Sequence, residues 1–179
     1  INACKELIFK NPDQAQIHID SMFEKAQELN YAFGLYTAHN YSAIKHFMKA
    51  EYKASVEAYR SALKYVDPHI PYQRIRLFSN ISLSHRKLNN RDSSLAYLLI
   101  VNEESKQNHL QESYQQSILD LGNFYLDNED FVSAGKYYSE TESYCKTAED
   151  TVFLVKAYSA LARFYQEVNN FDKSLHFYQ

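Results

Sequence analysis

The sequence is poor in glycine and proline, with 3 residues of each among 179, and it contains no tryptophan. A typical chain carries about 7% glycine and about 5% proline. Phosphate-binding loops, dinucleotide-binding fingerprints and most hairpin turns need glycine at fixed positions. The composition therefore disfavours P-loop, Rossmann and all-β proteins, and it favours long helices joined by short connections.

Cysteine, net charge and long apolar runs are scarce as well. Cys4 and Cys145 belong to no CxxC motif or Cys/His cluster, which disfavours a disulfide framework and a structural zinc site, so we expect two buried or half-buried thiols. The net charge of -3 provides no global basic field, so we expect no direct nucleic-acid binding by this segment. The longest apolar run, 95–101, is far shorter than the ~20 residues of a membrane span. Any membrane contact is therefore expected only through segments outside this one.

Tyrosine and phenylalanine are abundant, at 16 and 11 residues, and many of them recur at intervals of 39–40 residues. One register pairs small residues (Ser55, Ser94, Ala134, Ser174) with large ones four positions later (Tyr59, Leu98, Tyr138, Tyr178). A second register has small residues (Ala43, Ser82, Gly122, Ala162) between large ones four positions earlier (His39, Phe78, Ile118, Tyr158) and three positions later (His46, His85, Tyr125, Tyr165). Large–small–large at helical spacing is typical of a helix face packed against another helix.

Turn signals separate these registers. Asparagine and aspartate precede the second helix of a pair at 89–90, 128–130 and 169–170, where their side chains suit turns and N-caps. Pro68 and Pro71 interrupt the chain between two units. The sequence shows no sustained alternation of apolar and polar residues of the kind that predicts a β-strand. We expect helices over about 3–9, 13–29, 32–48, 51–65, 71–88, 92–107, 110–127, 130–145, 150–167 and from 171 onward, paired as about 1–29, 32–65, 71–107, 110–145 and 150–179.

The registers resemble the tetratricopeptide repeat (TPR), whose first helix has a large aromatic, Leu-Gly or Leu-Ala, and then Tyr. Its second helix has an aromatic, a small residue and a large one. The copies that match best are Tyr158…Leu161-Ala162…Tyr165…Phe171…Ser174…Tyr178 and Ile118…Leu121-Gly122…Tyr125…Phe131…Ala134…Tyr138. The resemblance covers about residues 12–179. It implies an all-α fold in one domain, a right-handed superhelix of antiparallel helix pairs known as a TPR-like α-solenoid.

The units are longer than the 34 residues of the common TPR. Units of 39–40 residues resemble those of bacterial regulatory proteins. One such group is the sensor regions of membrane-anchored histidine kinases and transcription factors of the Bacteroidetes type, and another is the cytoplasmic receptors for peptide pheromones. The resemblance implies a sensory or regulatory region in signal transduction or transcription regulation, either on the periplasmic side of a membrane or in the cytoplasm. A general interaction or assembly scaffold with no sensing role is the alternative.

First helices line the concave wall of such a stack, and side chains not used for packing there are free to contact a protein or peptide. The predicted groove residues are Asn40, Tyr41, Ile44, Arg76, Asn80, Leu83, Arg86, Lys87, Asn123, Lys156 and Arg163. Asparagine can donate to and accept from a peptide backbone, arginine can bind carboxylates, and Leu83 and Leu119 are expected to accommodate an apolar side chain. A solvated polar face is the alternative for each residue taken singly.

One class of TPR partner is excluded. Some TPR proteins hold the acidic C-terminal tail of chaperones with a Lys/Asn/Arg set called a carboxylate clamp. The corresponding positions here read Asn40, Ile44, Asn80, Gln116 and Asp120. Only Asn80 fits that set, so we do not expect binding of a chaperone tail.

No pattern indicates catalysis. His39, His46 and His85 fall in packing registers, no HExxH motif is present, and neither cysteine has a neighbouring base. We expect no enzymatic activity, no metal and no cofactor in this segment, with any effector domain outside it.

The expected helix from 171 stops two turns short of its register. We therefore expect a fragment of a longer polypeptide, with Tyr178 exposed and with open ends that pair in a homodimer.

Overall fold

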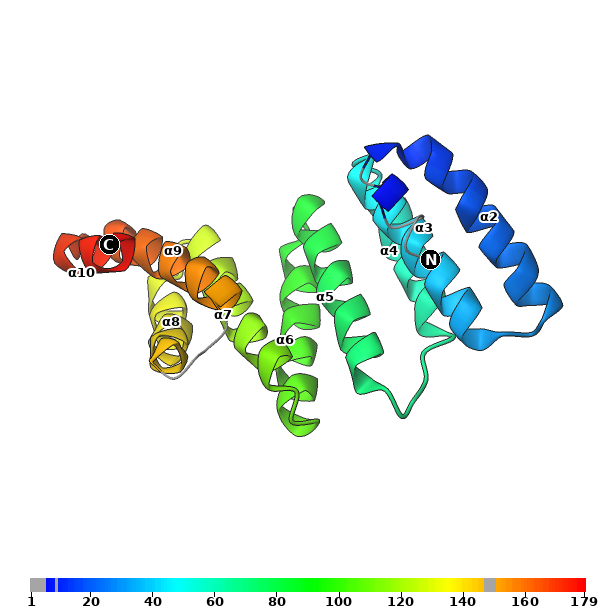
Figure 1. Cartoon of the computed structure of the whole chain (residues 1–179). Coiled ribbons are helices and arrows are strands. Elements are labelled where there is room, and N and C mark those ends of the chain that lie inside the picture. The colour runs from blue at the N-terminus through cyan, green and yellow to red at the C-terminus, as the bar shows by residue number, and fades with distance from the viewer. Residues whose placement is uncertain (1–5, 9, 147–150) are drawn as a thin grey trace. The chain divides into compact units, whose positions relative to one another are not determined.

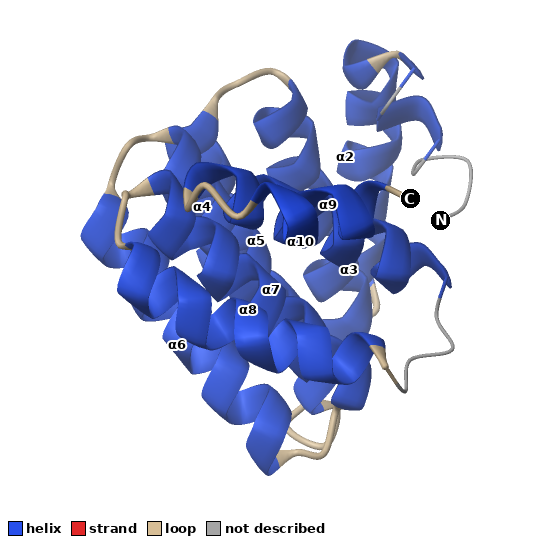
Figure 2. Cartoon of the chain, turned by 90° about the vertical axis from the view of Figure 1, so that its left-hand side faces the viewer, coloured by secondary structure: helices blue, strands red, loops and turns tan. Residues whose placement is uncertain are grey.

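The computed structural model describes residues 6–8, 10–146 and 151–179, and every regular element in these ranges is an α-helix (Figures 1 and 2). The helices are α2 (Pro12–Glu28), α3 (Ala32–Met48), α4 (Tyr52–Leu63), α5 (Pro71–Lys87), α6 (Arg91–Gln107), α7 (Gln111–Asp127), α8 (Phe131–Cys145), α9 (Thr151–Glu167) and α10 (Phe171–Tyr178). Their bounds confirm the sequence prediction to within two residues. The helix expected over 3–9 lies largely outside the described residues, although 6–8 are helical.

The chain forms two compact units, Ile1–Ile100 and Val101–Gln179, and the boundary falls within α6. In the first unit α3 packs on α2 and α4, and α4 packs on α5. In the second unit α7 packs on α8, α8 on α9, and α9 on α10. Helices that follow each other in sequence are thus neighbours in space, which confirms the predicted all-α helical-repeat fold. The continuous single domain expected over 1–179 stays a prediction.

Six helix–helix connections share one turn. In each, the residue after the helix C-cap adopts the left-handed conformation, with φ between 47° and 62°; these residues are Asn30, Ala50, Asn89, His109, Glu129 and Asn169. Between α3 and α4, Ala50 N donates to Phe47 O at 3.0 Å and Glu51 N donates to His46 O at 2.9 Å. This pair of bonds is the Schellman motif, and it recurs at the other five turns.

The residue that completes each motif immediately precedes the next helix, so one helix ends and the next begins without a linker. At three of these positions a polar side chain caps the new helix. Asn90 Oδ1 accepts from Ser93 N at 3.2 Å, Asp130 Oδ1 from Ser133 N at 3.0 Å, and Asn170 Oδ1 from Lys173 N at 3.2 Å. The predicted role of asparagine and aspartate in turns and N-caps is confirmed.

The small residues of the two registers meet where paired helices approach each other most closely. Ser82 Oγ on α5 donates to Ser94 O on α6 at 2.8 Å, and Ser174 Oγ on α10 donates to Ala162 O on α9 at 2.9 Å. All eight small positions are buried; they are Ala43, Ser55, Ser82, Ser94, Gly122, Ala134, Ala162 and Ser174. A larger side chain at these positions would separate the two backbones.

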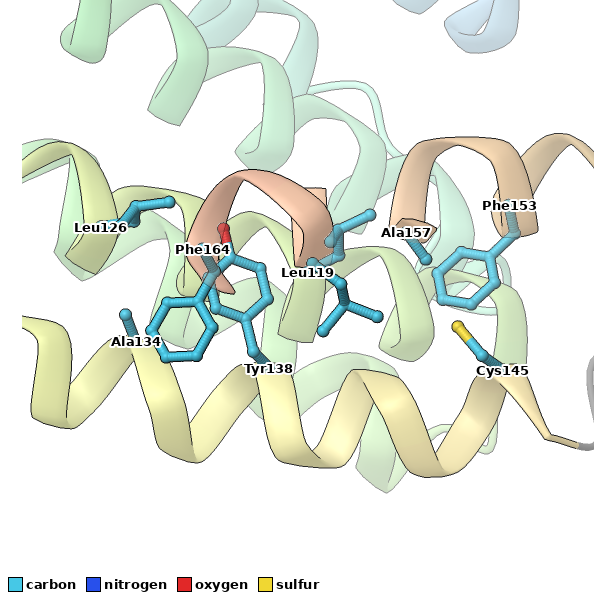
Figure 3. Packing of buried hydrophobic residues seen from close by; sticks show 9 residues of the cluster. Leu119, Leu126, Ala134, Tyr138, Cys145, Phe153, Ala157 and Phe164 are labelled. Carbon is cyan, nitrogen blue, oxygen red and sulfur yellow. The ribbon is translucent and has the colours of Figure 1, made fainter. Parts of the chain in front are cut away.

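The large residues of the registers fill the space beside these contacts. In the second unit, Tyr138 of α8 is completely buried, its ring centroid lies 4.8 Å from that of Phe164, and its hydroxyl donates to Asn123 Oδ1 at 2.8 Å (Figure 3). Leu119 and Ala157 belong to the same core cluster. Tyr178 is 62% exposed on α10, as the sequence predicts.

The first unit has two core clusters. One joins α3, α4 and α5 through Tyr36, Ala43, Val56, Tyr59, Ala62, Leu77 and Ile81. The other joins the N-terminal segment to α2 and α3 through Ile8, Ala15, Ile19 and Tyr41. Because α3 contributes to both clusters, its position is fixed from two sides. Its remaining face borders the candidate site.

Ala50 is a place where stability can be gained in a turn, since it holds a φ of 59° despite its β-carbon. We expect Ala50→Gly to raise the free energy of unfolding by about 0.5–1 kcal/mol, because glycine adopts the left-handed conformation without a steric penalty. Urea unfolding followed by circular dichroism measures the change. Asn89→Gly is the control: asparagine tolerates this conformation, so its replacement should stabilise much less. Equal gains for both variants would contradict this explanation.

Two helical glycines give a matched test of core packing. A β-carbon at Gly135 would lie 3.4 Å from Phe164 Cζ, an ordinary contact, whereas one at Gly122 would lie 3.1 Å from the Tyr138 ring. Alanine stabilises either helix by about 1 kcal/mol over glycine, but overpacking against the buried Tyr138 costs about 1–3 kcal/mol. We therefore expect the Gly122→Ala protein to have a free energy of unfolding about 1–3 kcal/mol lower than that of the Gly135→Ala protein. Equal stabilities would mean that the Tyr138 ring shifts freely.

Candidate functional site

The candidate site is a pocket of about 420 Å³ in the first unit, with walls formed by α3 and α5. We call it the α3–α5 pocket. Its lining residues are Ile8, Phe33, Tyr36, Thr37, Asn40, Tyr41, Ile44, Ile70, Tyr72, Gln73, Arg76 and Asn80. Five of the predicted groove residues are among them: Asn40, Tyr41, Ile44, Arg76 and Asn80. The structure therefore brings together the predicted residues of two consecutive first helices.

Helix periodicity places the lining side chains on one face of each helix. Tyr36 and Asn40 are four residues apart on α3, as are Arg76 and Asn80 on α5, so each pair occupies adjacent turns. The repeat of 39 residues between these two helices makes position 76 the equivalent of position 37, which follows Tyr36. The two helices are linked at the pocket, because Arg76 Nη2 donates to the Tyr36 hydroxyl at 2.7 Å.

Arg76 lies between two aromatic rings. Its Cζ is 5.9 Å from the ring centroid of Tyr36 and 5.9 Å from that of Tyr72, within the range of cation–π attraction. Burial raises the pKa of Tyr36 above its usual value, so this phenol remains neutral and keeps its proton. Arg76 forms no ion pair with any residue that the structure describes.

Asn40 is the unusual residue of the pocket. Its side chain is 4% exposed, and its Oδ1 has no hydrogen-bond partner in the described part of the chain. A buried polar atom without a partner costs about 1–3 kcal/mol relative to a satisfied one. Because buried polar atoms are nearly always paired in native proteins, this atom marks a place where a donor from outside the chain is expected.

Two of the sequence predictions need correction. Leu119, expected to accommodate an apolar side chain of a partner, is 2% exposed and belongs to the core cluster of α7, α8 and α9, so that prediction is wrong. Tyr41, expected to be free of packing, is 8% exposed and lies in the cluster with Ile8, Ala15 and Ile19. Both residues face a neighbouring helix that single-helix periodicity does not identify.

The other predicted groove residues lie outside the pocket. Leu83 is half-buried on α5, and Arg86 and Lys87 are exposed at the end of that helix. In the second unit, Lys156 is exposed on α9. Asn123 and Arg163 are engaged within that unit, since Asn123 accepts from the Tyr138 hydroxyl and Arg163 Nη2 donates to Asp127 Oδ1 at 2.7 Å.

Sequence reasoning missed the aromatic lining of the pocket. Phe33, Tyr36 and Tyr72 line it together with Thr37 and Gln73, and none of them was predicted as a groove residue. Tyr36 was detectable, since it stands four residues before the predicted Asn40. Tyr72 carried a signal too, because its equivalent 39 residues earlier is the aromatic Phe33.

The histidines of the packing registers contact aromatic rings. The His39 ring stacks on Tyr65 with centroids 5.6 Å apart, and the His85 ring stacks on Tyr97 at 5.8 Å. Burial lowers the pKa of both imidazoles below the usual value. Within the described residues, no three His, Cys, Asp or Glu side chains converge in an arrangement suited to a metal ion.

The thiol prediction can be examined for one of the two cysteines. Cys145 is buried and unpaired at the end of α8, and burial raises its pKa to about 11. Cys4 lies outside the described residues. None of the helices in the described part of the chain has the length and apolarity that a membrane span requires.

Replacement of Asn40 tests the unsatisfied amide. We expect Asn40→Leu to raise the free energy of unfolding by about 1–3 kcal/mol, because the substitution removes a buried acceptor without a partner and keeps a similar volume. Chemical denaturation measures the change. Thr37→Val is the matched control: its hydroxyl already donates to Phe33 O at 2.7 Å, so its loss should give no gain. A destabilised Asn40→Leu protein would show that the amide serves the fold.

The comparisons with known proteins concern the fold. No family model matches this chain, and no curated protein matches it. Among solved structures, BtubC (BKLC) from P. vanneervenii superposes with a TM-score of 0.83 at 14% identity, covering 97% of this chain and 73% of that one. Aspartyl phosphate phosphatase F from Bacillus subtilis gives 0.76 at 14% identity, covering 99% of this chain and 56% of that one. These likenesses agree with a TPR-like helical-repeat fold, and the TPR family itself remains a resemblance.

Proposed function

We propose that this chain is a non-catalytic helical-repeat scaffold that binds a peptide segment of a protein in the α3–α5 pocket. The observation that carries the proposal is the buried Asn40 Oδ1, which has no donor among the described residues and lies in the wall of a pocket rich in aromatic side chains. An extended peptide supplies a backbone N–H at regular intervals and therefore satisfies such an acceptor. The aromatic and aliphatic walls supply the apolar contact that gives a peptide its affinity.

The mixed lining favours a peptide over a flat protein surface. Phe33, Tyr36, Tyr72 and Ile44 provide apolar area, while a few polar groups at fixed positions provide orientation. Both walls are helices that their own core clusters hold in place, so the pocket exists before the ligand arrives. A preformed site reduces the entropy lost on binding.

We also propose that the scaffold is the sensory or regulatory region of a bacterial signalling or transcription-regulatory protein. Support for this role comes from the repeat length of 39–40 residues, which resembles that of such proteins. A ligand that contacts α3 and α5 together would change the angle between two successive helix pairs, and stacked repeats transmit such changes through small, adjustable interfaces. A general assembly scaffold with no sensing role is the alternative.

Peptide selection tests binding in the pocket. We expect a phage-displayed library of random dodecapeptides, panned against the full chain, to yield sequences whose synthetic forms bind with micromolar affinity in fluorescence anisotropy. Asn40→Leu should weaken that binding about tenfold, because the peptide N–H would lose its acceptor. Asn108→Leu, at an exposed site of the second unit, is the matched control and should bind normally.

Two outcomes would contradict the proposal. Either no sequence is enriched in the selection, or the enriched peptides bind the Asn40→Leu and Asn108→Leu variants equally well. Circular dichroism spectra of both variants establish that helicity is retained. A scaffold that binds its partner elsewhere would give the second outcome.

A further inference from the structure

Arg76 differs from Arg60 and Arg163 in its polar partner. Arg60 pairs with Glu57 at 3.0 Å and Arg163 pairs with Asp127 at 2.7 Å, so each of those guanidinium groups has a carboxylate within the chain. The Arg76 guanidinium instead donates to a neutral phenol. It is also the one charged side chain among the described residues that line the α3–α5 pocket. The pocket therefore carries a positive charge in a protein whose net charge is -3.

The donors at Arg76 suit a carboxylate. A guanidinium has five N–H donors, and the bond to Tyr36 occupies one of them. Tyr36 accepts that bond, so its own hydroxyl hydrogen is available for donation to the same incoming group. The guanidinium and the phenol hydroxyl thus offer donors to the two oxygens of one carboxylate, and the bond from the charged guanidinium is stronger than one between neutral groups.

The spacing of side chains along α3 sets a sequence pattern for the ligand. Asn40 lies one helical turn beyond Tyr36 and Ile44 lies one turn beyond Asn40, and side chains four apart on a helix have β-carbons about 5–6 Å apart. An extended peptide advances about 3.3 Å per residue, so the two turns from Tyr36 to Ile44 correspond to about four of its residues. Side chains four apart in an extended peptide lie on the same face. Ile44 provides an apolar surface for the second side chain.

We infer that the α3–α5 pocket recognises an extended peptide with an acidic side chain four positions from a large apolar one. The carboxylate is bound by Arg76 and the Tyr36 hydroxyl, a backbone N–H of the peptide donates to Asn40 Oδ1, and the apolar side chain packs against Ile44. This inference rests on the proposed peptide binding and adds the chemical class of the peptide.

The test uses acetylated, amidated octapeptide pools in which Glu and Phe are fixed four positions apart, in either order, and the other positions are randomised. A matched set replaces Glu with Gln, and a third set has Gln together with a free C-terminal carboxylate. We expect the Glu pools to bind the full chain roughly fivefold more tightly than the Gln pools, because Arg76 is exposed and an exposed charge pair contributes modestly to affinity. The difference should shrink as salt is raised.

The variants identify the residue responsible. In Arg76→Gln the preference for Glu should fall to within about twofold, whereas Arg91→Gln, at an exposed site of the same unit, should keep it. Arg76→Lys retains the charge without the planar fork and should show an intermediate preference. If Arg76→Gln loses its helical circular dichroism spectrum, Arg76→Lys together with Tyr36→Phe provides the same comparison.

The possible failures are distinguishable. Equal binding of Glu and Gln pools, or a preference for Glu that survives in Arg76→Gln, overturns this inference and leaves peptide binding standing. Tighter binding of the pool with a free carboxylate terminus also overturns it, because the recognised group would then be a chain end. If no pool binds at all, the proposed function fails together with the inference.

Discussion

The close approach of two helices at small residues is the constraint on which the rest of this structure depends. At Ser82 and Ser94 the two backbones are near enough for a side-chain hydroxyl to bond to the opposite carbonyl, at 2.8 Å. A serine in a core normally carries a desolvation cost, but here each hydroxyl replaces its water partner with one across the interface. Because such pairs recur every 39–40 residues, each helix pair repeats the same geometry.

This packing scheme divides every first helix into two kinds of face. Ala43 and its equivalents face the second helix of their own pair and cannot be enlarged. Side chains one or two positions away from these small residues contact the next helix pair or line a pocket. Tyr36 shows how narrow this division is, because its ring belongs to the core cluster while its hydroxyl accepts a bond from Arg76 at the pocket wall. Core and candidate site thus share a residue.

The α3–α5 pocket has features that stability alone does not explain. Asn40 buries an oxygen without a donor, and the Arg76 guanidinium has no carboxylate among the described residues. In a core selected only for stability, an apolar side chain in place of Asn40 would be better. Sites that bind ligands keep such groups because their partners arrive with the ligand. Both features lie in one pocket, and that coincidence motivates both proposals.

The sequence by itself determined the helices, their turns and the packing registers, because these depend on residues three to seven apart and on turn chemistry. Asn89 and Asn169 indicated turns, and both adopt the left-handed conformation there. Which polar residues remain free was decided only by the tertiary structure. Arg163 is paired with Asp127, 36 residues away, while Arg76 meets Tyr36 across 40. Periodicity within one helix places a side chain on a face, but its partner is set by the neighbouring helix, whose distance and angle follow from packing.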